Sequence, residues 1–131
     1  MSAEPAACSA AKRCVPCESL DKSHLLTEEQ VASEIAEMKL WRIEGSKIVR
    51  EYTAKNFQAA IDSLNAVGVI AERENHHPDF HLTGYRNVRL ELYTHSLGGL
   101  SQNDISLAKM IDDEVKVIYS PKWLKSHPDA G

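Results

Sequence analysis

The sequence predicts an α+β fold, a two-layer sandwich in which a four-stranded antiparallel sheet carries its helices on one face. Two observations lead to this prediction. Apolar residues recur at helical spacing in two segments, 57–71 and 105–111, and a capping box opens a third helix, whereas apolar and polar residues alternate in strand-like segments between them. The resulting order is α-β-β-α-β-β-α, and neighbouring strands in pairs are typical of an antiparallel sheet with helices packed on one side.

The first three elements follow from local signals. Residues 27–30 (TEEQ) form a capping box, which predicts a helix that runs to about Met38. Apolar and polar residues alternate over residues 41–44 (WRIE), as they do in a half-buried strand. Gly45-Ser46 supplies a two-residue hairpin turn, and residues 47–53 return as the second strand.

The central helix is the clearest element. It begins at Phe57 and is expected to end near residues 72–75. Its stripe of apolar residues at helical spacing comprises Ala60, Ile61, Leu64, Val67 and Ala71. Pro78 disfavours helical geometry at the residue before it, so the polar stretch 76–79 is expected to be a turn.

The last elements are a second strand pair and a helix. Residues 80–85 are expected to form the third strand, and residues 88–95 the fourth, because Val88, Leu90, Leu92 and Thr94 alternate with polar or aromatic residues. Gly98-Gly99 ends that strand. Ser101 and Asp104 have the spacing of a capping box, which predicts a final helix that reaches about Asp113.

Three regions divide the chain. Residues 1–25 form a leader without periodicity, residues 26–114 the domain, and residues 115–131 a C-terminal extension in which Pro121 and Pro128 are expected to limit regular structure. All three cysteines (Cys8, Cys14, Cys17) lie in the leader, so none is expected to cross-link the core, as is usual in a reducing compartment. Cys14 and Cys17 have the spacing of half a zinc site, which leaves a metal or redox role open beside free thiols.

Composition excludes some partners. The net charge is −4 and acidic and basic residues are mixed along the chain, which argues against direct binding to nucleic acid. No apolar run approaches the roughly 18 residues of a membrane span. The leader lacks the apolar centre of a secretory signal, so we expect an intracellular protein, most simply a cytoplasmic one.

Histidines are the strongest candidates for chemistry. Four of the six histidines, His76, His77, His81 and His95, fall within twenty residues. An imidazole accepts and donates protons near neutral pH, so a cluster in polar loops indicates acid–base chemistry. The side chains of adjacent His76 and His77 are expected to diverge. His95 has the opposite parity to the apolar stripe of its strand, so we expect it on the sheet face away from the helices.

Two alternative roles compete with catalysis. Asp104 is expected at least to stabilise the helix N-terminus, and it could also orient a histidine. A metal site is a competitor because histidines and a carboxylate also bind zinc, but these histidines lack the H-x-H and H-x-x-x-H spacings. Glu72 could likewise be only a solvent-exposed helix residue with no role in catalysis.

The spacing Glu72-x3-His76-His77-Pro78-x6-Tyr85-x9-His95-x8-Asp104 resembles the signature of the pterin-4a-carbinolamine dehydratase family. The likeness extends over about residues 27–113. It includes the segments around the signature, Asn56-Phe57, Asn65-Ala66-Val67-Gly68 and Thr94-His95-Ser96-x-Gly98-Gly99-Leu100-Ser101-x-Asn103-Asp104. The Cys14-Val-Pro-Cys17 leader is similar to that of some microbial and plant members.

The resemblance implies a reaction: loss of water from 4a-hydroxytetrahydrobiopterin to give quinonoid dihydropterin, in support of tetrahydrobiopterin recycling. It implies that His76, His77, His95 and Asp104 form the active site. In this assignment His77 and His95 transfer protons, His76 contacts the substrate, with a role as acid left open, and Asp104 orients a histidine. The substrate-binding residues it implies are Glu72, Asn75, His76, His77, Pro78, Tyr93, Thr94, His95 and Ser96.

The same resemblance implies no cofactor and no metal, a small-molecule pterin as partner, and a homodimer or homotetramer. Two other functions stay open. The first is a non-enzymatic protein-interaction module that acts like a coactivator. The second is a dehydratase for another pterin, linked to maintenance of the molybdopterin cofactor.

Overall fold

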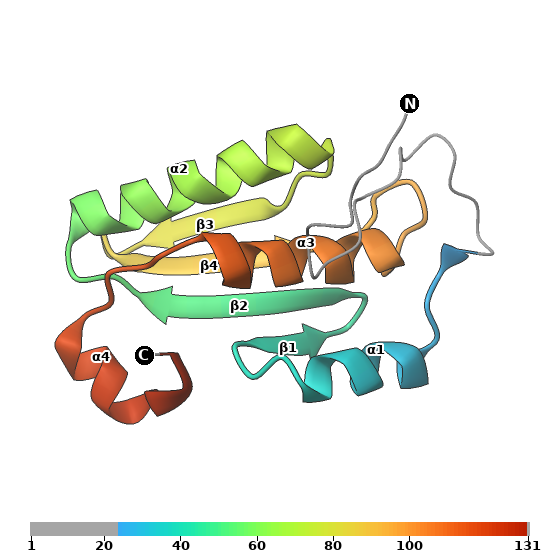
Figure 1. Cartoon of the computed structure of the whole chain (residues 1–131), viewed down its shortest axis with the longest axis horizontal. Helices are drawn as coiled ribbons and strands as arrows, with labels where there is room; N and C mark the ends of the chain where they lie inside the picture. Colours follow the sequence, from blue (N-terminus) through green and yellow to red (C-terminus); the bar gives the residue numbers. More distant parts are fainter. Residues whose placement is uncertain (1–23, 131) are drawn as a thin grey trace.

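The computed structural model describes residues 24–130, in which four strands form one antiparallel sheet with helices packed against it (Figure 1). The predicted α+β fold is confirmed. In chain order the elements are α1 (Glu28–Ala36), β1 (Trp41–Glu44), β2 (Lys47–Thr53), α2 (Phe57–Glu74), β3 (Asp79–Thr83), β4 (Asn87–Leu92), α3 (Gln102–Glu114), α4 (Pro121–Ser126) and a 3₁₀ turn (Pro128–Ala130).

The predicted capping box opens α1, and a second capping side chain opens α2. Thr27 Oγ1 accepts a hydrogen bond from Gln30 N at 3.1 Å, and the Gln30 side chain accepts one from Thr27 N at 2.8 Å. Asn56 caps α2 by accepting a hydrogen bond from Ala59 N at 2.8 Å. These side chains satisfy amide groups that have no partner within the helix.

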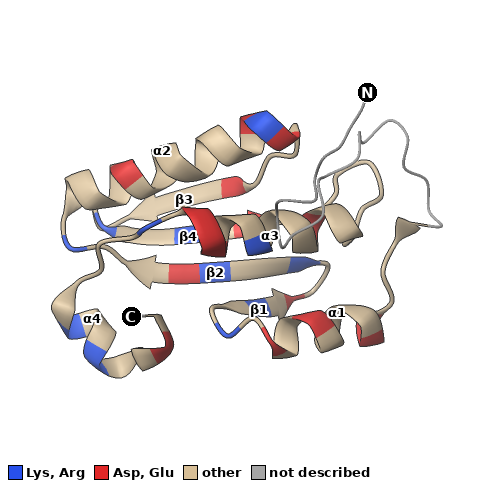
Figure 2. Ribbon diagram, in the orientation of Figure 1, with Lys and Arg blue, Asp and Glu red and all other residues tan. Residues whose placement is uncertain are grey.

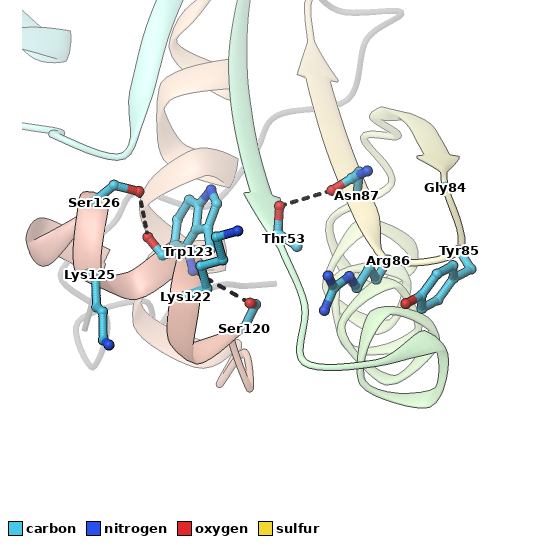
Figure 3. A pocket seen from close by; sticks show the side chains of 10 residues that line it. All are labelled: Thr53, Gly84, Tyr85, Arg86, Asn87, Ser120, Lys122, Trp123, Lys125 and Ser126. Carbon is cyan, nitrogen blue, oxygen red and sulfur yellow. Dashed lines mark hydrogen bonds between the residues drawn. The ribbon is translucent and has the colours of Figure 1, made fainter.

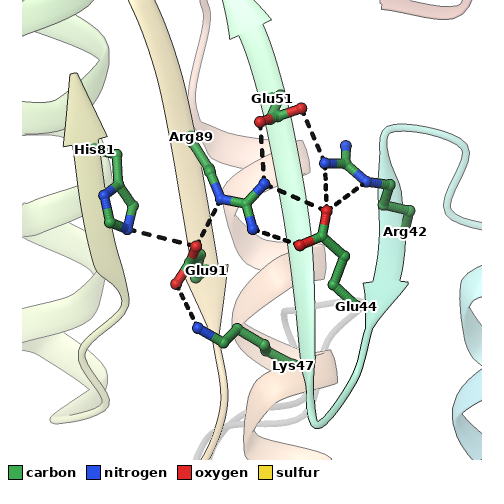
Figure 4. Close-up of polar contacts among 7 residues, drawn as sticks. All are labelled: Arg42, Glu44, Lys47, Glu51, His81, Arg89 and Glu91. Carbon is green, nitrogen blue, oxygen red and sulfur yellow. Dashed lines mark hydrogen bonds and ion pairs between the residues drawn. The ribbon is translucent and has the colours of Figure 1, made fainter. Parts of the chain in front are cut away.

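The strand order β1-β2-β4-β3 places β2 and β4 in the centre of the sheet. Leu90 of β4 pairs with Arg50 of β2 and with Phe80 of β3, so even-numbered residues of these three strands share one face. Ile48, Leu90 and Leu92 on this face are fully buried beneath the helices, and α2 and α3 contact each other above them. The odd-numbered residues of these strands form the opposite face. Arg42 and Glu44 of β1 share this face because they pair with Val49 and Lys47 of β2, and with Lys47, Glu51, Arg89 and Glu91 they give it acidic and basic side chains in contact with one another (Figure 2 and Figure 4).

The C-terminal extension covers part of a sheet edge. Pairing between β1 and β2 stops at Trp41 and Arg50, and beyond that point the extension runs beside β2. Ala54 and Tyr119 form a β-bridge, and Ser120 N donates to Thr53 O at 2.9 Å. α4 follows and lies at this edge (Figure 1), where Trp123 comes close to Thr53 (Figure 3). The extension thus pairs backbone groups of an edge that would otherwise be exposed.

A buried arginine ties the extension to the core. Arg50 is 3% exposed; it donates to Asp112 Oδ1 at 2.8 Å and to the Tyr119 hydroxyl at 2.6 Å. Burial raises the pKa of Asp112, although hydrogen bonds from Trp41 and Arg50 favour its charged form.

Three expectations from the sequence need correction. The third strand ends at Thr83 rather than Tyr85, because Gly84 and Tyr85 adopt left-handed backbone conformations (φ 54° and 59°) that turn the chain. The fourth strand ends at Leu92 rather than His95, because the chain then closes a turn in which Gly98 N donates to Thr94 O. Pro121 and Pro128 do not prevent structure; each opens a helical turn, where the missing N–H costs nothing.

Within residues 24–130, none of the helices combines the length and the apolar content needed to cross a bilayer.

Candidate active site

The end of α2 turns His76 into the protein. Asn75 adopts the left-handed conformation (φ 53°, ψ 42°) at the helix C-cap, and His76 N donates back to Ala71 O at 3.1 Å. This reversal leaves His76 only 4% exposed, with its Nε2 atom 2.7 Å from Asp104 Oδ1. A carboxylate at this distance fixes the orientation of the imidazole ring.

Asp104 is the centre of a buried polar cluster. Its side chain is fully buried in the first turn of α3, near the positive end of the helix dipole. Its Oδ2 atom accepts hydrogen bonds from Thr94 Oγ1 at 2.8 Å and from Ser101 N at 2.9 Å. The hydroxyls of Thr94 and Ser101 lie 2.7 Å apart. Asp104 therefore both caps the helix and holds His76, so its two predicted roles coexist.

His77 points the other way. Its side chain is 54% exposed, and its Nε2 atom lies 2.6 Å from Glu72 Oε2. Glu72 is itself 79% exposed on the last turns of α2. The expected divergence of the adjacent histidines is thus confirmed: one imidazole is enclosed by the protein, and the other is accessible to a ligand.

His95 lies in the turn that follows β4. It is exposed, and its ring centroid lies 4.1 Å from that of Tyr93. Thr94, its neighbour, forms a β-bridge with Gly99, and Gly98 adopts a φ of 68° that suits glycine. Because β4 has already ended, the parity argument does not apply to His95. Its exposure comes from its position in this closed turn.

The buried cluster joins the two loops that carry the exposed histidines. His77 follows His76, and His95 follows Thr94; both of these neighbours are hydrogen-bonded to Asp104. The loops are therefore fixed relative to each other through one carboxylate. Catalytic groups held by such buried hydrogen bonds need little reorganisation when a substrate binds.

The other predicted site residues lie in the turn after α2 or in the segment after β4. Asn75 and Pro78 belong to the turn that positions His76 and His77, and Tyr93 supports His95. Ser96 is exposed in the His95 turn. The sequence reasoning missed the hydrogen bond from the Thr94 side chain to Asp104 and the contact between the hydroxyls of Thr94 and Ser101. The apolar parity of Thr94 was the available signal, since it placed that side chain on the buried face.

His81 is separated from this cluster. It lies on the charged face of the sheet, half-exposed, with Nε2 3.4 Å from Glu91 Oε2 (Figure 4). Hydrogen bonds from Lys47 and then Arg89 lower the pKa of Glu91 to about 2. Arg89 also donates a hydrogen bond to Glu44. This bond and a weaker contribution from the hydrogen bond of Arg42 lower the pKa of Glu44 to about 2.

The sequence of this chain is similar to those of known proteins. The family model for pterin 4 alpha carbinolamine dehydratase matches residues 24–114. The chain belongs to this family. Pterin-4-alpha-carbinolamine dehydratase 2, mitochondrial, of Arabidopsis thaliana is 37% identical over 106 residues, which cover 78% of this chain and 56% of that longer relative. A putative pterin-4-alpha-carbinolamine dehydratase of Chloroflexus aurantiacus is 41% identical over 88 residues, 67% of this chain and 94% of that relative.

A solved structure is similar in fold. The transcriptional coactivator/pterin dehydratase from Brucella Melitensis superimposes with a TM-score of 0.64 and 26% identity, over 70% of this chain and 99% of that one. The match to the family model ends at Glu114. The C-terminal extension, which contains α4, lies beyond that match.

A metal centre is the alternative to acid–base catalysis by these histidines. Within residues 24–130, no three side chains of His, Cys, Asp or Glu are grouped so that they could hold a metal ion. The predicted Cys14-x-x-Cys17 half-site lies outside the described residues, as does Cys8. That this chain needs no metal for its reaction stays a prediction.

Proposed function

We propose that the chain catalyses the dehydration of 4a-hydroxytetrahydrobiopterin to quinonoid dihydropterin and water by histidine acid–base catalysis. The observation that carries the proposal is the hydrogen-bonded group of His76, Asp104 and Thr94, which fixes the loops of His77 and His95. Membership of the pterin carbinolamine dehydratase family supports the choice of substrate.

The proposed reaction needs one acid and one base. The acid protonates the 4a-hydroxyl group, the C4a–O bond breaks and water leaves, while the base takes the proton from N5. No electron is gained or lost overall. His77 and His95 are assigned to these proton transfers because their imidazoles are exposed to solvent and hence to a ligand. General acid–base catalysis by such groups accelerates reactions about 10²–10⁴-fold.

The remaining residues are proposed to bind and orient. His76 would contact the pterin from within the fold, its ring held by Asp104. Glu72 would orient His77, and Tyr93 would support His95. The backbone around Asn75 and from Tyr93 to Ser96 would bind the amide edge of the pterin, together with Pro78.

The experiment is a rate measurement. Freshly generated 4a-hydroxytetrahydropterin is mixed with the full chain, with and without a chelator, and dehydration is followed by absorbance. We expect a large acceleration over the spontaneous reaction, unchanged by the chelator. Folded protein that gives only the spontaneous rate would refute the proposal, and loss of rate with the chelator would refute its metal-free mechanism.

Finer parts of the function are proposals of the same kind. We propose that the reaction supports tetrahydrobiopterin recycling in the cytoplasm, and that the chain forms a homodimer or homotetramer. Comparison of rates on biopterin- and molybdopterin-type substrates separates recycling from the molybdopterin-linked alternative.

A coactivator-like interaction module is the second candidate. The solved Brucella Melitensis protein with the same fold is called both a transcriptional coactivator and a pterin dehydratase, which favours keeping this candidate. A partner that copurifies with the full chain, and that still binds a His77→Ala variant, would support a separate binding role.

A further inference from the structure

A second candidate site lies at the other end of the sheet from the histidines. A cavity of about 720 Å³ is bounded by the end of β2, the turn between β3 and β4, and the C-terminal extension (Figure 3). His76 and His77 precede β3, whereas this turn follows it, and a strand of five residues spans roughly 15–17 Å. The cavity is therefore distinct from the proposed active site.

Half of the cavity is built by the segment beyond the family match. This segment contributes Ser120, Lys122, Trp123, Lys125 and Ser126. The Chloroflexus aurantiacus relative is matched over 94% of its own length, which leaves only 6% of that chain for any counterpart of the extension. Half of the cavity lining thus lies outside the segment that the family model matches.

The cavity is positively charged in a protein whose net charge is −4. Arg86, Lys122 and Lys125 line it, and none of its lining residues is acidic. None of these three cations forms an ion pair within the described part of the chain, whereas Arg89 and Arg73 each bind carboxylates. Their charges are therefore available to a ligand.

The cavity is also lined by side chains with uncharged hydrogen-bond donors, Asn87 and Trp123. The Asn87 side chain accepts from Thr53 Oγ1 at 2.9 Å through its oxygen, so its NH₂ group remains as a donor. The Trp123 ring, which lines the cavity, stacks on the rings of Tyr119 and His127 at centroid distances of 5.0 and 4.0 Å. Its indole N–H has no acceptor within residues 24–130.

We propose that this cavity binds the phosphate groups of a small phosphorylated molecule, preferably a diphosphate. Arginine and lysine are the usual phosphate-binding residues, and three unpaired cations favour an anion with several charges over a single carboxylate. The volume falls in the range of roughly 300–1,000 Å³ that is typical of small-molecule sites.

Isothermal titration calorimetry on the full chain tests the proposal, with inorganic pyrophosphate and inorganic phosphate as probes at about 0.15 M salt, where exposed charges are already screened. We expect saturable binding of one pyrophosphate per chain, tighter than that of phosphate. The variant Lys122→Gln/Lys125→Gln should weaken binding about tenfold or more, because each lysine would donate a charge-assisted hydrogen bond. Arg86→Gln should weaken it by a similar factor.

The matched control is Lys39→Gln/Lys116→Gln. It removes the same charge from two lysines that also lack an ion pair in residues 24–130 and do not line the cavity. Its affinity should stay within about twofold of the unmodified chain, since distant surface charges are screened at this salt concentration. Equal weakening in both double variants would overturn the proposal, because the effect would then be one of net charge.

Further probes identify the kind of ligand. ADP that competes with pyrophosphate would support a phosphorylated small molecule, and ADP that is excluded while pyrophosphate binds would contradict it. An absence of saturable pyrophosphate binding would also overturn the proposal. So would a poly-glutamate peptide that binds where pyrophosphate does not, because the site would then be a surface for acidic proteins. The Lys122→Gln/Lys125→Gln variant should keep the full dehydration rate, so this test is independent of the proposed active site.

Discussion

His76 and His77 are adjacent in the sequence, yet one is enclosed and the other is accessible. The His76 side chain is 4% exposed and contacts a fully buried carboxylate, whereas His77 is 54% exposed beside a carboxylate that is itself in solvent. His95 resembles His77 in exposure. The left-handed Asn75 creates this difference, because it ends α2 and turns the next side chain inward.

The comparison separates two contributions to a histidine site. The enclosed side chains hold the loops in place, so their loss should affect folding. The exposed imidazoles contribute little packing, so their loss should affect chemistry. A cluster of histidines that looks uniform in the sequence is therefore expected to give two different classes of variant.

The largest effect is expected at the exposed histidines. His77→Ala and His95→Ala should each lower the catalysed dehydration rate about 10²–10⁴-fold, because each removes a proton-transfer group. The free energy of unfolding should change by no more than about 0.5 kcal/mol, as is usual for exposed positions. Initial rates and urea unfolding of the same preparations measure both quantities.

His81→Ala is the matched control for these variants. His81 belongs to the same run of histidines and is 50% exposed, but it lies on the charged face. It should keep the full rate. An equal loss of rate in His81→Ala, or unfolding of His77→Ala, would contradict the division between the two regions.

The next effect concerns the enclosed region. Asp104→Ala removes a carboxylate that accepts hydrogen bonds from Thr94 and Ser101 and contacts His76. The partners would remain buried without an acceptor, so the free energy of unfolding should fall by about 2–4 kcal/mol. Urea unfolding monitored by circular dichroism measures this loss. A change below about 0.5 kcal/mol would show that the cluster does not hold the loops.

A smaller effect, on the pH dependence of the free energy of unfolding, is expected for the charged face of the sheet. The pKa of Glu91 is lowered to about 2 in the folded protein, below its ordinary value of 4.5, by Lys47 and Arg89. The folded state therefore gains stability from charged Glu91 above pH 4.5, and this gain disappears as the pH falls toward 2. Glu91→Gln should be less stable than the unmodified chain at pH 6, and the difference should narrow in acid. Urea midpoints between pH 6 and pH 2.5 test this, and a constant difference would contradict it.

The smallest effect is expected for Glu72→Gln. Glu72 is 79% exposed, and ion pairs between exposed groups contribute up to about 1 kcal/mol. If Glu72 only orients His77, the dehydration rate should fall by no more than about fivefold, with unchanged unfolding. A loss as large as that of His77→Ala would instead make Glu72 a direct participant.

Local signals in the sequence were sufficient for most of the fold. The capping box at Thr27, the alternation in residues 41–44 and the hairpin turn at Gly45-Ser46 correspond to elements in the structure because each depends on neighbours a few residues away. The end of β4 was not predictable in this way. Its alternation continues to His95, but the backbone leaves the sheet at Leu92 to form a turn closed by Gly98.

The site was partly predictable as well. The spacing of the histidines and Asp104 identified the residues, but not which histidine Asp104 contacts, because that contact joins residues 28 positions apart. The structure of the extension was also beyond local reasoning. Pro121 reads as a helix breaker in the sequence, and it becomes a helix start only because Ser120 pairs with Thr53 and places it at the first turn.

The most direct test of the histidine site is an NMR titration of the full chain with a stable pterin. The six histidines provide an internal comparison, since His24, His81 and His127 lie outside the proposed site. We predict that the ring signals of His76, His77 and His95 shift together and saturate at one pterin per chain, while the other three stay in place. Saturable binding that shifts His81 or His127 instead, and leaves His77 and His95 unchanged, would contradict the assignment of the active site.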